Sequence, residues 1–163
     1  MIKEILLGQF DTCYNENGWF VAVRNVIDGI GVEEAAWKES DDVNCIWESL
    51  SHLTYYNEAN LQRFKGIDFQ HSISHNNDTF NTGEYEEAEW QADVARFDQI
   101  MREFRQLIAA ADETKFSQSV SAQNPATWAE VIADINAHNA YHAGQMLLML
   151  KLQGKWNPSK GVS

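Results

Sequence analysis

Two histidines near the end of the chain occupy positions where a helix usually buries hydrocarbon. His138 and His142 are four residues apart, so both imidazoles lie on one face of a helix, one turn apart. The other residues of that stripe, which follow the three-four spacing of a helix in a bundle, are Trp128, Val131, Ile135, Gln145 and Met149. A buried imidazole costs free energy unless it finds a partner, and two rings on one face can share a metal ion. The pair therefore predicts a metal site.

A second pair with the same separation, His71 and His75, provides an internal comparison. It lies in the polar sequence QHSISHNND, where no helical stripe orients the side chains. We interpret these two residues as solvated loop histidines. Helical context, and not the four-residue spacing, makes His138 and His142 informative.

His52 is the predicted third ligand. It falls on the inward edge of a helix in IWESLSHLTYYNEANL, one residue before Leu53. The three neutral imidazoles of His52, His138 and His142 would leave at least one coordination position open for water or substrate, unlike closed four-ligand sites. Zinc and nickel suit imidazole nitrogen, and iron and copper also accept such ligands. The sequence therefore predicts an open three-histidine site for a divalent metal ion.

Four polar residues are expected around this site. Asp134 and Glu48 each lie one turn before a predicted ligand, where a carboxylate could accept a hydrogen bond from the ring. The alternative for each is a solvated surface carboxylate. Gln145 and Tyr56 are expected to border the cavity.

The elements that must position these residues are all predicted to be helices. Four segments show helical periodicity, and both prolines lie outside them. The expected helices cover residues 2–30 with a kink near 15–18, residues 45–65, a stretch that begins with the acidic residues 84–89 and includes Ile108, and a stretch after Pro125 that ends near Gln153. The predicted fold class is therefore all-α.

Capping residues are expected before the second and the fourth helix. The polar cluster at residues 41–44 contains several side chains that can cap the second helix. For the fourth helix two alternatives stand, Asn124 followed by Pro125, and a capping box of Thr127 and Glu130.

About twenty residues, 66–85, separate the second and third helices without any periodicity. A connection of that length in a compact domain usually has a role, and in a four-helix bundle it often crosses the whole bundle. We therefore predict a four-helix bundle of up-down-down-up order, with this segment as the crossover. The length of the chain and the lack of a linker predict a single domain over residues 1–163.

The composition and net charge of the chain limit the kinds of molecule that it can be expected to bind. Hydrophobic residues make up 44% of the chain, which favours a packed interior, and the formal charge of −12 opposes binding to nucleic acid or anionic membranes. Cys13 and Cys45 form no CxxC pair, and we expect both to be small buried hydrophobes. No stretch approaches the roughly 18 apolar residues of a membrane span, and the opening residues lack the pattern of a signal peptide. We expect a cytoplasmic protein.

The segments IWESLSHLTYYNEANLQRFKG and HNAYHAGQMLLMLKLQGKW resemble the DinB/YfiT-like metalloprotein superfamily. The similarity covers essentially the whole chain, and its most specific element is the histidine of the second helix followed by HxxxHxGQ on the last. The resemblance implies a four-helix bundle of up-down-down-up order, a divalent metal on His52, His138 and His142, and commonly a homodimer. Characterised members include S-transferases that use low-molecular-weight thiols and a mycothiol-dependent maleylpyruvate isomerase.

Two functions from different classes follow. The first is a metal-dependent thiol S-transferase, in which a low-molecular-weight thiol attacks a small-molecule electrophile and neither Cys13 nor Cys45 takes part. The alternative is a non-catalytic metal-binding structural or stress-response bundle, stabilised by the ion. A bundle without metal, whose histidines are satisfied by hydrogen bonds, comes third. Trp19 and Trp37 are candidates for a dimer interface or a substrate mouth, with core or surface positions as the alternative.

Overall fold

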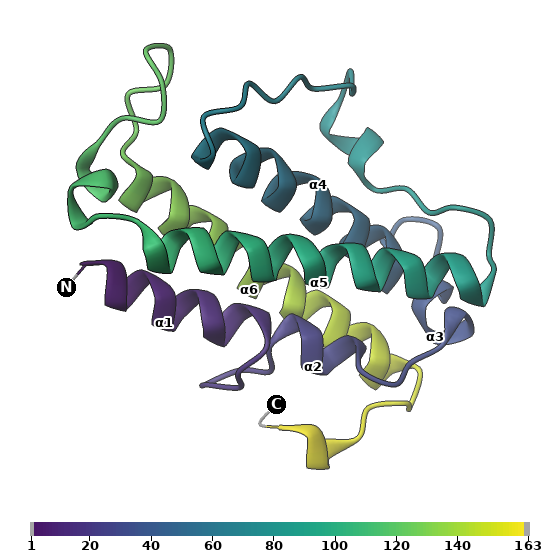
Figure 1. Cartoon of the computed structure of the whole chain (residues 1–163). Coiled ribbons are helices and arrows are strands. Elements are labelled where there is room, and N and C mark those ends of the chain that lie inside the picture. The colour runs from purple at the N-terminus through teal and green to yellow at the C-terminus, as the bar shows by residue number, and fades with distance from the viewer. Residues whose placement is uncertain (1, 162–163) are drawn as a thin grey trace.

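A computed structural model of the chain describes residues 2–161 and consists of helices and their connections (Figure 1). The α-helices are α1 (Ile2–Tyr14), α2 (Val23–Ile27), α3 (Val32–Ala36), α4 (Ile46–Phe64), α5 (Glu87–Ala110) and α6 (Trp128–Leu152). Three short 3-10 helices are η1 (Asn76–Thr79), η2 (Glu113–Ser117) and η3 (Pro158–Lys160). Residues 2–161 contain no β-strand, and one isolated bridge pairs Ser119 with Thr127. The all-α prediction is confirmed.

The four long helices, α1, α4, α5 and α6, pack around one hydrophobic core (Figure 1). The closest neighbours are α4 with α5 and α1 with α6. Trp47, Trp90 and Trp128 are among the largest fully buried side chains and contribute from α4, α5 and α6, respectively. Burial of this apolar surface supplies the main favourable free energy of folding.

The predicted first helix, residues 2–30, is wrong as a single element. α1 ends at Tyr14, and the chain continues as two short helices, α2 and α3. The break falls where the sequence carries Asn15, Asn17 and Gly18, residues of low helix propensity. The side-chain oxygen of Asn17 accepts the backbone N–H of Ala22 at 3.0 Å, so this side chain stabilises a turn in place of the helix.

The two helices that carry His52, His138 and His142, which are α4 and α6, each begin with a capping box. At α4 the N-cap is Cys45, not a residue of the cluster 41–44: the Glu48 carboxylate accepts the N–H of Cys45 at 2.9 Å. At α6 the N-cap is Thr127, whose N–H donates to the carboxylate of Glu130 at 2.7 Å, so the second of the two predicted caps is correct. These caps fix where the helices that carry the histidines begin.

Both cysteines are free and buried, as predicted. Burial raises the pKa of the Cys13 and Cys45 thiols to about 11, so neither is a thiolate near neutral pH. None of the described helices is both long enough and apolar enough to cross a membrane.

The segment between α4 and α5 contains η1 and runs back along the bundle. Figure 1 shows it leaving the end of α4 and returning to the opposite end of the molecule, where α5 begins. The turn of η1 packs against α4 on the way. We call residues 65–86 the crossover segment.

A reciprocal amide pair fixes α4 against α6. The side-chain N–H of Asn57 donates to the oxygen of Asn139 at 2.8 Å, and the N–H of Asn139 donates to the oxygen of Asn57 at 3.2 Å. Both side chains are fully buried, and Asn57 also donates to the carbonyl of Leu53 at 2.8 Å. A buried amide without its partner carries a desolvation penalty, so the pair favours one register of the two helices.

We expect Asn57→Ala to lower the free energy of unfolding by about 2–3 kcal/mol, because Asn139 would stay buried without its partner. Asn60→Ala is the matched control: its amide also donates one turn back, to the carbonyl of Tyr56, but bonds nothing on α6 within the described residues. Urea denaturation measures the free energy of unfolding of both variants. Equal losses in the two variants would contradict a special role for the pair.

Candidate metal centre

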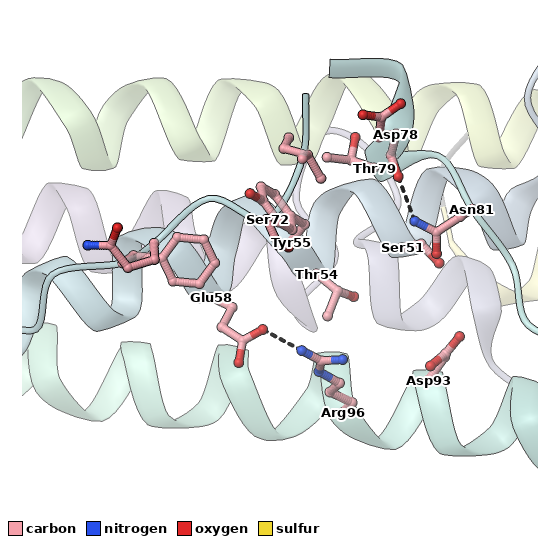
Figure 2. Close-up of a pocket in the computed structure, with 13 residues that line it drawn as sticks. Ser51, Thr54, Tyr55, Glu58, Ser72, Asp78, Thr79, Asn81, Asp93 and Arg96 are labelled. Atoms are coloured by element: carbon pink, nitrogen blue, oxygen red, sulfur yellow. Dashed lines mark hydrogen bonds and ion pairs between the residues drawn. The ribbon is translucent and has the colours of Figure 1, made fainter. Parts of the chain in front are cut away.

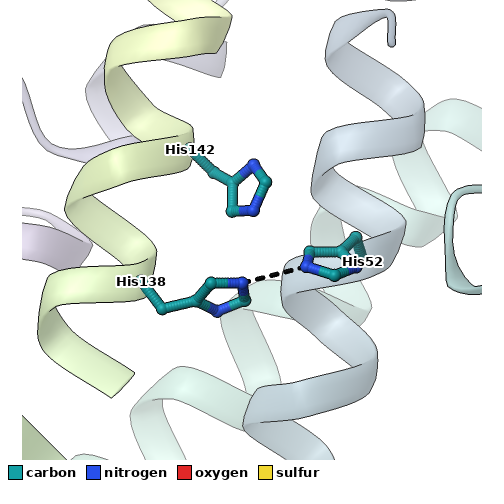
Figure 3. A group of neighbouring side chains, drawn as sticks. All are labelled: His52, His138 and His142. Carbon is teal, nitrogen blue, oxygen red and sulfur yellow. Dashed lines mark hydrogen bonds between the residues drawn. The ribbon is translucent and has the colours of Figure 1, made fainter. Parts of the chain in front are cut away.

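Three histidines from two helices converge at one point. His52 comes from α4, and His138 and His142 come from α6. One ring nitrogen from each lies within 4.8 Å of the others, and His52 Nε2 is 2.9 Å from His138 Nε2. Figure 3 shows the three rings turned toward one another across the space between the helices. The structure thus brings together all three residues that the sequence singled out.

The group lies at the edge of the core and not inside it. His52 is 3% exposed and His142 is 5% exposed, whereas His138 is half-buried. The predicted stripe of α6 is rotated relative to the buried face, since Val131 is half-buried and Gln145 is exposed. The residues of α6 that do face the core are Trp128, Ile132, Ile135, Asn136, Asn139, Ala143, Met146, Met149 and Leu150. The rotation leaves the histidines in contact with both the core and an open pocket.

Burial sets the protonation of the rings. It lowers the pKa of His52 to about 3 and that of His142 to about 4, with the neighbouring rings adding to the effect. Burial also lowers the pKa of His138. All three imidazoles are therefore neutral near pH 7, and each has a nitrogen lone pair available for a metal ion.

An open pocket with a volume of about 590 Å³ lies in front of the rings. Its walls come from α4, the residues just before α4, α6 and the crossover segment. They include the aromatic side chains of Tyr56, Phe80 and Tyr141, the carboxamides of Asn44, Asn60, Asn76 and Gln145, and the carboxylate of Asp134. The prediction that Tyr56 and Gln145 border the cavity is confirmed.

Two residues of the crossover segment hold His52, and sequence reasoning missed both. Thr79 Oγ1 lies 2.6 Å from His52 Nδ1. The ring of Phe80 stacks on the His52 ring, with centroids 4.0 Å apart and an interplanar angle of 11°. The length of the segment indicated a role, but no periodicity identified the residues that perform it.

The two carboxylates that were expected beside the histidines have other positions. Glu48 accepts hydrogen bonds from the ammonium of Lys38 at 2.7 Å and from the backbone of Cys45, so its role is at the start of α4. Asp134 lines the pocket, but within residues 2–161 it makes no hydrogen bond to a histidine ring. The acceptor beside His52 is a hydroxyl and not a carboxylate.

The comparison histidines, His71 and His75, are exposed and lie outside the three-histidine group, as predicted. They are not equivalent. His71 Nδ1 is 2.7 Å from the Tyr55 hydroxyl, and its Nε2 is 2.6 Å from the guanidinium of Arg63.

A second pocket, of about 480 Å³, lies on another side of α4, between α4, α5 and the crossover segment (Figure 2). An ion pair between Glu58 and Arg96 at 2.5 Å crosses its wall. Thr79, whose hydroxyl lies beside His52, also lines this second pocket. It therefore lies between the second pocket and the His52 ring.

The two tryptophans that were considered for an interface differ. Trp19 is 100% exposed in the connection between α1 and α2, and Trp37 is half-buried against the core. Neither is among the described residues that line the two pockets.

The donor set fits a metal ion. The three neutral imidazoles point ring nitrogens at one place, as a zinc-like ion requires. In the described part of the chain, the buried Nδ1 of His142 has no hydrogen-bond partner. In Figure 3 this nitrogen lies on the side of the ring away from the other two histidines, and the other ring nitrogen of His142 faces them.

For the metal-free protein we expect the free energy of unfolding to fall as the pH is lowered from 7 to 4. Each histidine takes up a proton near pH 6.5 when unfolded, whereas His52 and His142 do so only near pH 3 and 4 when folded. The unfolded state binds more protons in this range, at most about 1.4 kcal/mol per pH unit for each residue. Urea denaturation with a chelator, at several pH values, measures the slope.

His142→Gln should reduce this slope, because it removes one of the rings whose pKa is lowered by folding. An unaltered slope in His142→Gln would contradict the protonation states given above.

A family model of the DinB superfamily matches residues 21–146. The matched region covers well over half of the chain and includes His52, His138 and His142. Comparisons with curated proteins and with solved structures give no match. On its sequence, the chain belongs to the DinB superfamily.

Proposed function

We propose that His52, His138 and His142 bind one divalent metal ion, with zinc or nickel the best fit to imidazole donors. The observation that carries the proposal is the convergence of three ring nitrogens within 4.8 Å of one another at the wall of a pocket. Membership in the DinB superfamily supports the same site.

We further propose that the protein is a metal-dependent thiol S-transferase that acts with a low-molecular-weight thiol on a small electrophile. A metal ion bound by three histidines would supply an open coordination position that lowers the pKa of a thiol. The thiol proton would pass to solvent, and the sulfur electron pair would form a C–S bond while the leaving group departs with the electrons of its own bond. The open pocket in front of the rings supports this proposal over a closed structural site.

The pocket walls indicate what kind of electrophile fits. Tyr56, Phe80 and Tyr141 offer aromatic surface, and four carboxamides can donate and accept hydrogen bonds. Among the described residues that line it there is no lysine or arginine, and Asp134 provides a carboxylate. We therefore propose a small substrate without negative charge, part aromatic or apolar and part hydrogen-bonding.

The alternative, a non-catalytic metal-binding bundle, has one observation in its favour. The three rings join α4 to α6, so a bound ion would stabilise the contact between these helices by linkage. The experiments below separate the two functions.

We also make proposals for the topology, the domain organisation, the location and the partners of the protein. The return of the crossover segment in Figure 1 supports the up-down-down-up order, and we propose a single domain over residues 1–163. We also propose a cytoplasmic protein, and the charge of −12 supports action on small molecules and not on nucleic acid or membranes.

We also propose a homodimer, with the outer face of α6 as its contact surface. On this face Tyr141, Leu148 and Leu152 are large and exposed, with Leu148 at 51%. Apolar side chains that gather on one face favour contact with a second copy, since a two-fold axis buries the same patch on both chains.

Protein purified without a histidine tag should contain about one zinc or nickel ion per chain. His142→Ala should lose it, because two imidazoles hold a metal ion far more weakly than three, whereas His75→Ala should retain it. Elemental analysis and calorimetric titration measure occupancy and affinity. A wild-type protein that binds no divalent metal would overturn both proposed functions.

With metal bound, the protein should accelerate the reaction of at least one thiol with a chlorobimane, in a panel of bacillithiol, mycothiol, glutathione and coenzyme A. Fluorescence reports thiol consumption, and metal-free protein and His142→Ala are the controls. If no thiol in the panel reacts faster than in these controls, the non-catalytic metal-binding bundle replaces the transferase.

For the dimer, Leu148→Glu should convert the protein to a monomer by size-exclusion chromatography with light scattering, because it places charge in the apolar contact. Ile67→Glu, at a similarly exposed apolar residue of the crossover segment, is the matched control and should stay dimeric. A monomeric wild type at micromolar concentration would rule out the proposal.

A further inference from the structure

Two adjacent residues of the crossover segment enclose the ring of His52. Thr79 is 2% exposed and meets the edge of the ring, with Oγ1 2.6 Å from Nδ1. Phe80 covers one face of the ring in a stacked contact at 4.0 Å. The other two histidines meet His52 from α6, at ring centroid distances of 4.9 and 4.8 Å.

The direction of the hydrogen bonds at Thr79 follows from its single hydroxyl proton. Thr79 donates that proton to the backbone carbonyl of Asn76 at 2.6 Å. Its oxygen must then accept from His52, so the proton of the neutral ring lies on Nδ1. The lone pair of His52 is left on Nε2.

Nε2 is the nitrogen that faces the other ligands. It lies 2.9 Å from His138 Nε2, and with its lone pair free it accepts the proton that His138 carries. A metal ion would replace that proton and find the His52 lone pair already directed at it. The opposite tautomer would place a proton on Nε2, where the ion should bind.

We propose that Thr79 is a positioning residue, which holds His52 in the Nδ1–H tautomer and in the ring orientation needed for metal binding. This inference rests on the proposed metal site and adds to it a residue outside the helices. The chain of hydrogen bonds runs from His52 Nδ1 through Thr79 Oγ1 to the Asn76 carbonyl. The crossover segment is thereby part of the metal centre.

Thr79→Val removes the acceptor and keeps the shape of the side chain. We expect zinc affinity to fall about 10- to 100-fold, the usual effect of losing the partner of a histidine ligand. Thr79→Ser should restore it. Thr54→Val is the matched control: Thr54 is also buried and lines the second pocket, but its hydroxyl donates to the carbonyl of Leu50 and not to a histidine.

A second readout needs no metal. Nitrogen-15 NMR of the histidine rings, recorded with a chelator present, should show the Nδ1–H tautomer for His52 in the wild type, Thr79→Ser and Thr54→Val. In Thr79→Val the Nε2–H tautomer should become populated. Thr79→Ala provides the same comparison if the valine variant does not fold.

The proposal is overturned if Thr79→Val, or Thr79→Ala in its place, binds zinc as tightly as the wild type and leaves the His52 tautomer unchanged. A wild type that binds no metal would overturn the proposed function by itself. In that case the NMR comparison in the metal-free protein still decides whether Thr79 sets the tautomer.

Discussion

The register between α4 and α6 is the constraint on which the three-histidine group depends. His52 belongs to one helix and the other two histidines to its neighbour, and the reciprocal amide pair of Asn57 and Asn139 is fully buried between them. A shift of one residue along a helix moves a side chain by about 1.5 Å and turns it by about 100°. Metal ligands tolerate only a few tenths of an ångström. The buried hydrogen bonds between the two amides therefore fix the relative position of α4 and α6 more closely than apolar packing alone would.

The position of the histidines at the edge of the core reconciles two requirements. Burial keeps the rings neutral and their lone pairs available, as the lowered pKa values of His52 and His142 show. Access requires that one side of the group faces an open volume, and His138 is only half-buried beside the pocket. A deeper site would satisfy the first requirement and exclude any ligand.

The histidines of α6 could be singled out from the sequence because helix periodicity is local: residues four apart share a face whatever surrounds the helix. The limits of α6 followed from the same periodicity together with its capping box, whereas the cap of α4 is Cys45 and not a residue of the predicted polar cluster. Thr79 and Phe80 could not be found in this way, since they lie in irregular chain whose path depends on tertiary contacts. Helical periodicity also failed at residues 15–22, where the Asn17 side chain competes for the backbone. Asp134 was expected to accept a hydrogen bond from a histidine ring, but it lines the pocket without such a bond among the described residues, since spacing alone does not determine where a side chain finds its partner.

In the described part of the crossover segment, Thr79 at the end of η1 and Phe80 after it make the hydrogen bond and the stacked contact with His52, while residues 65–75 lead back from the end of α4. Lengthening a flexible loop costs little, about 0.6 kcal/mol for each doubling of its length. In this stretch an insertion would also change the contacts of His71 with Tyr55 and Arg63. Insertions there would leave the ligand geometry intact. They would reshape the second pocket, whose walls include Phe69, Gln70 and Ser72. In such a fold the surroundings of His52 and the second pocket can diverge at different rates, because separate stretches of one loop contribute to them.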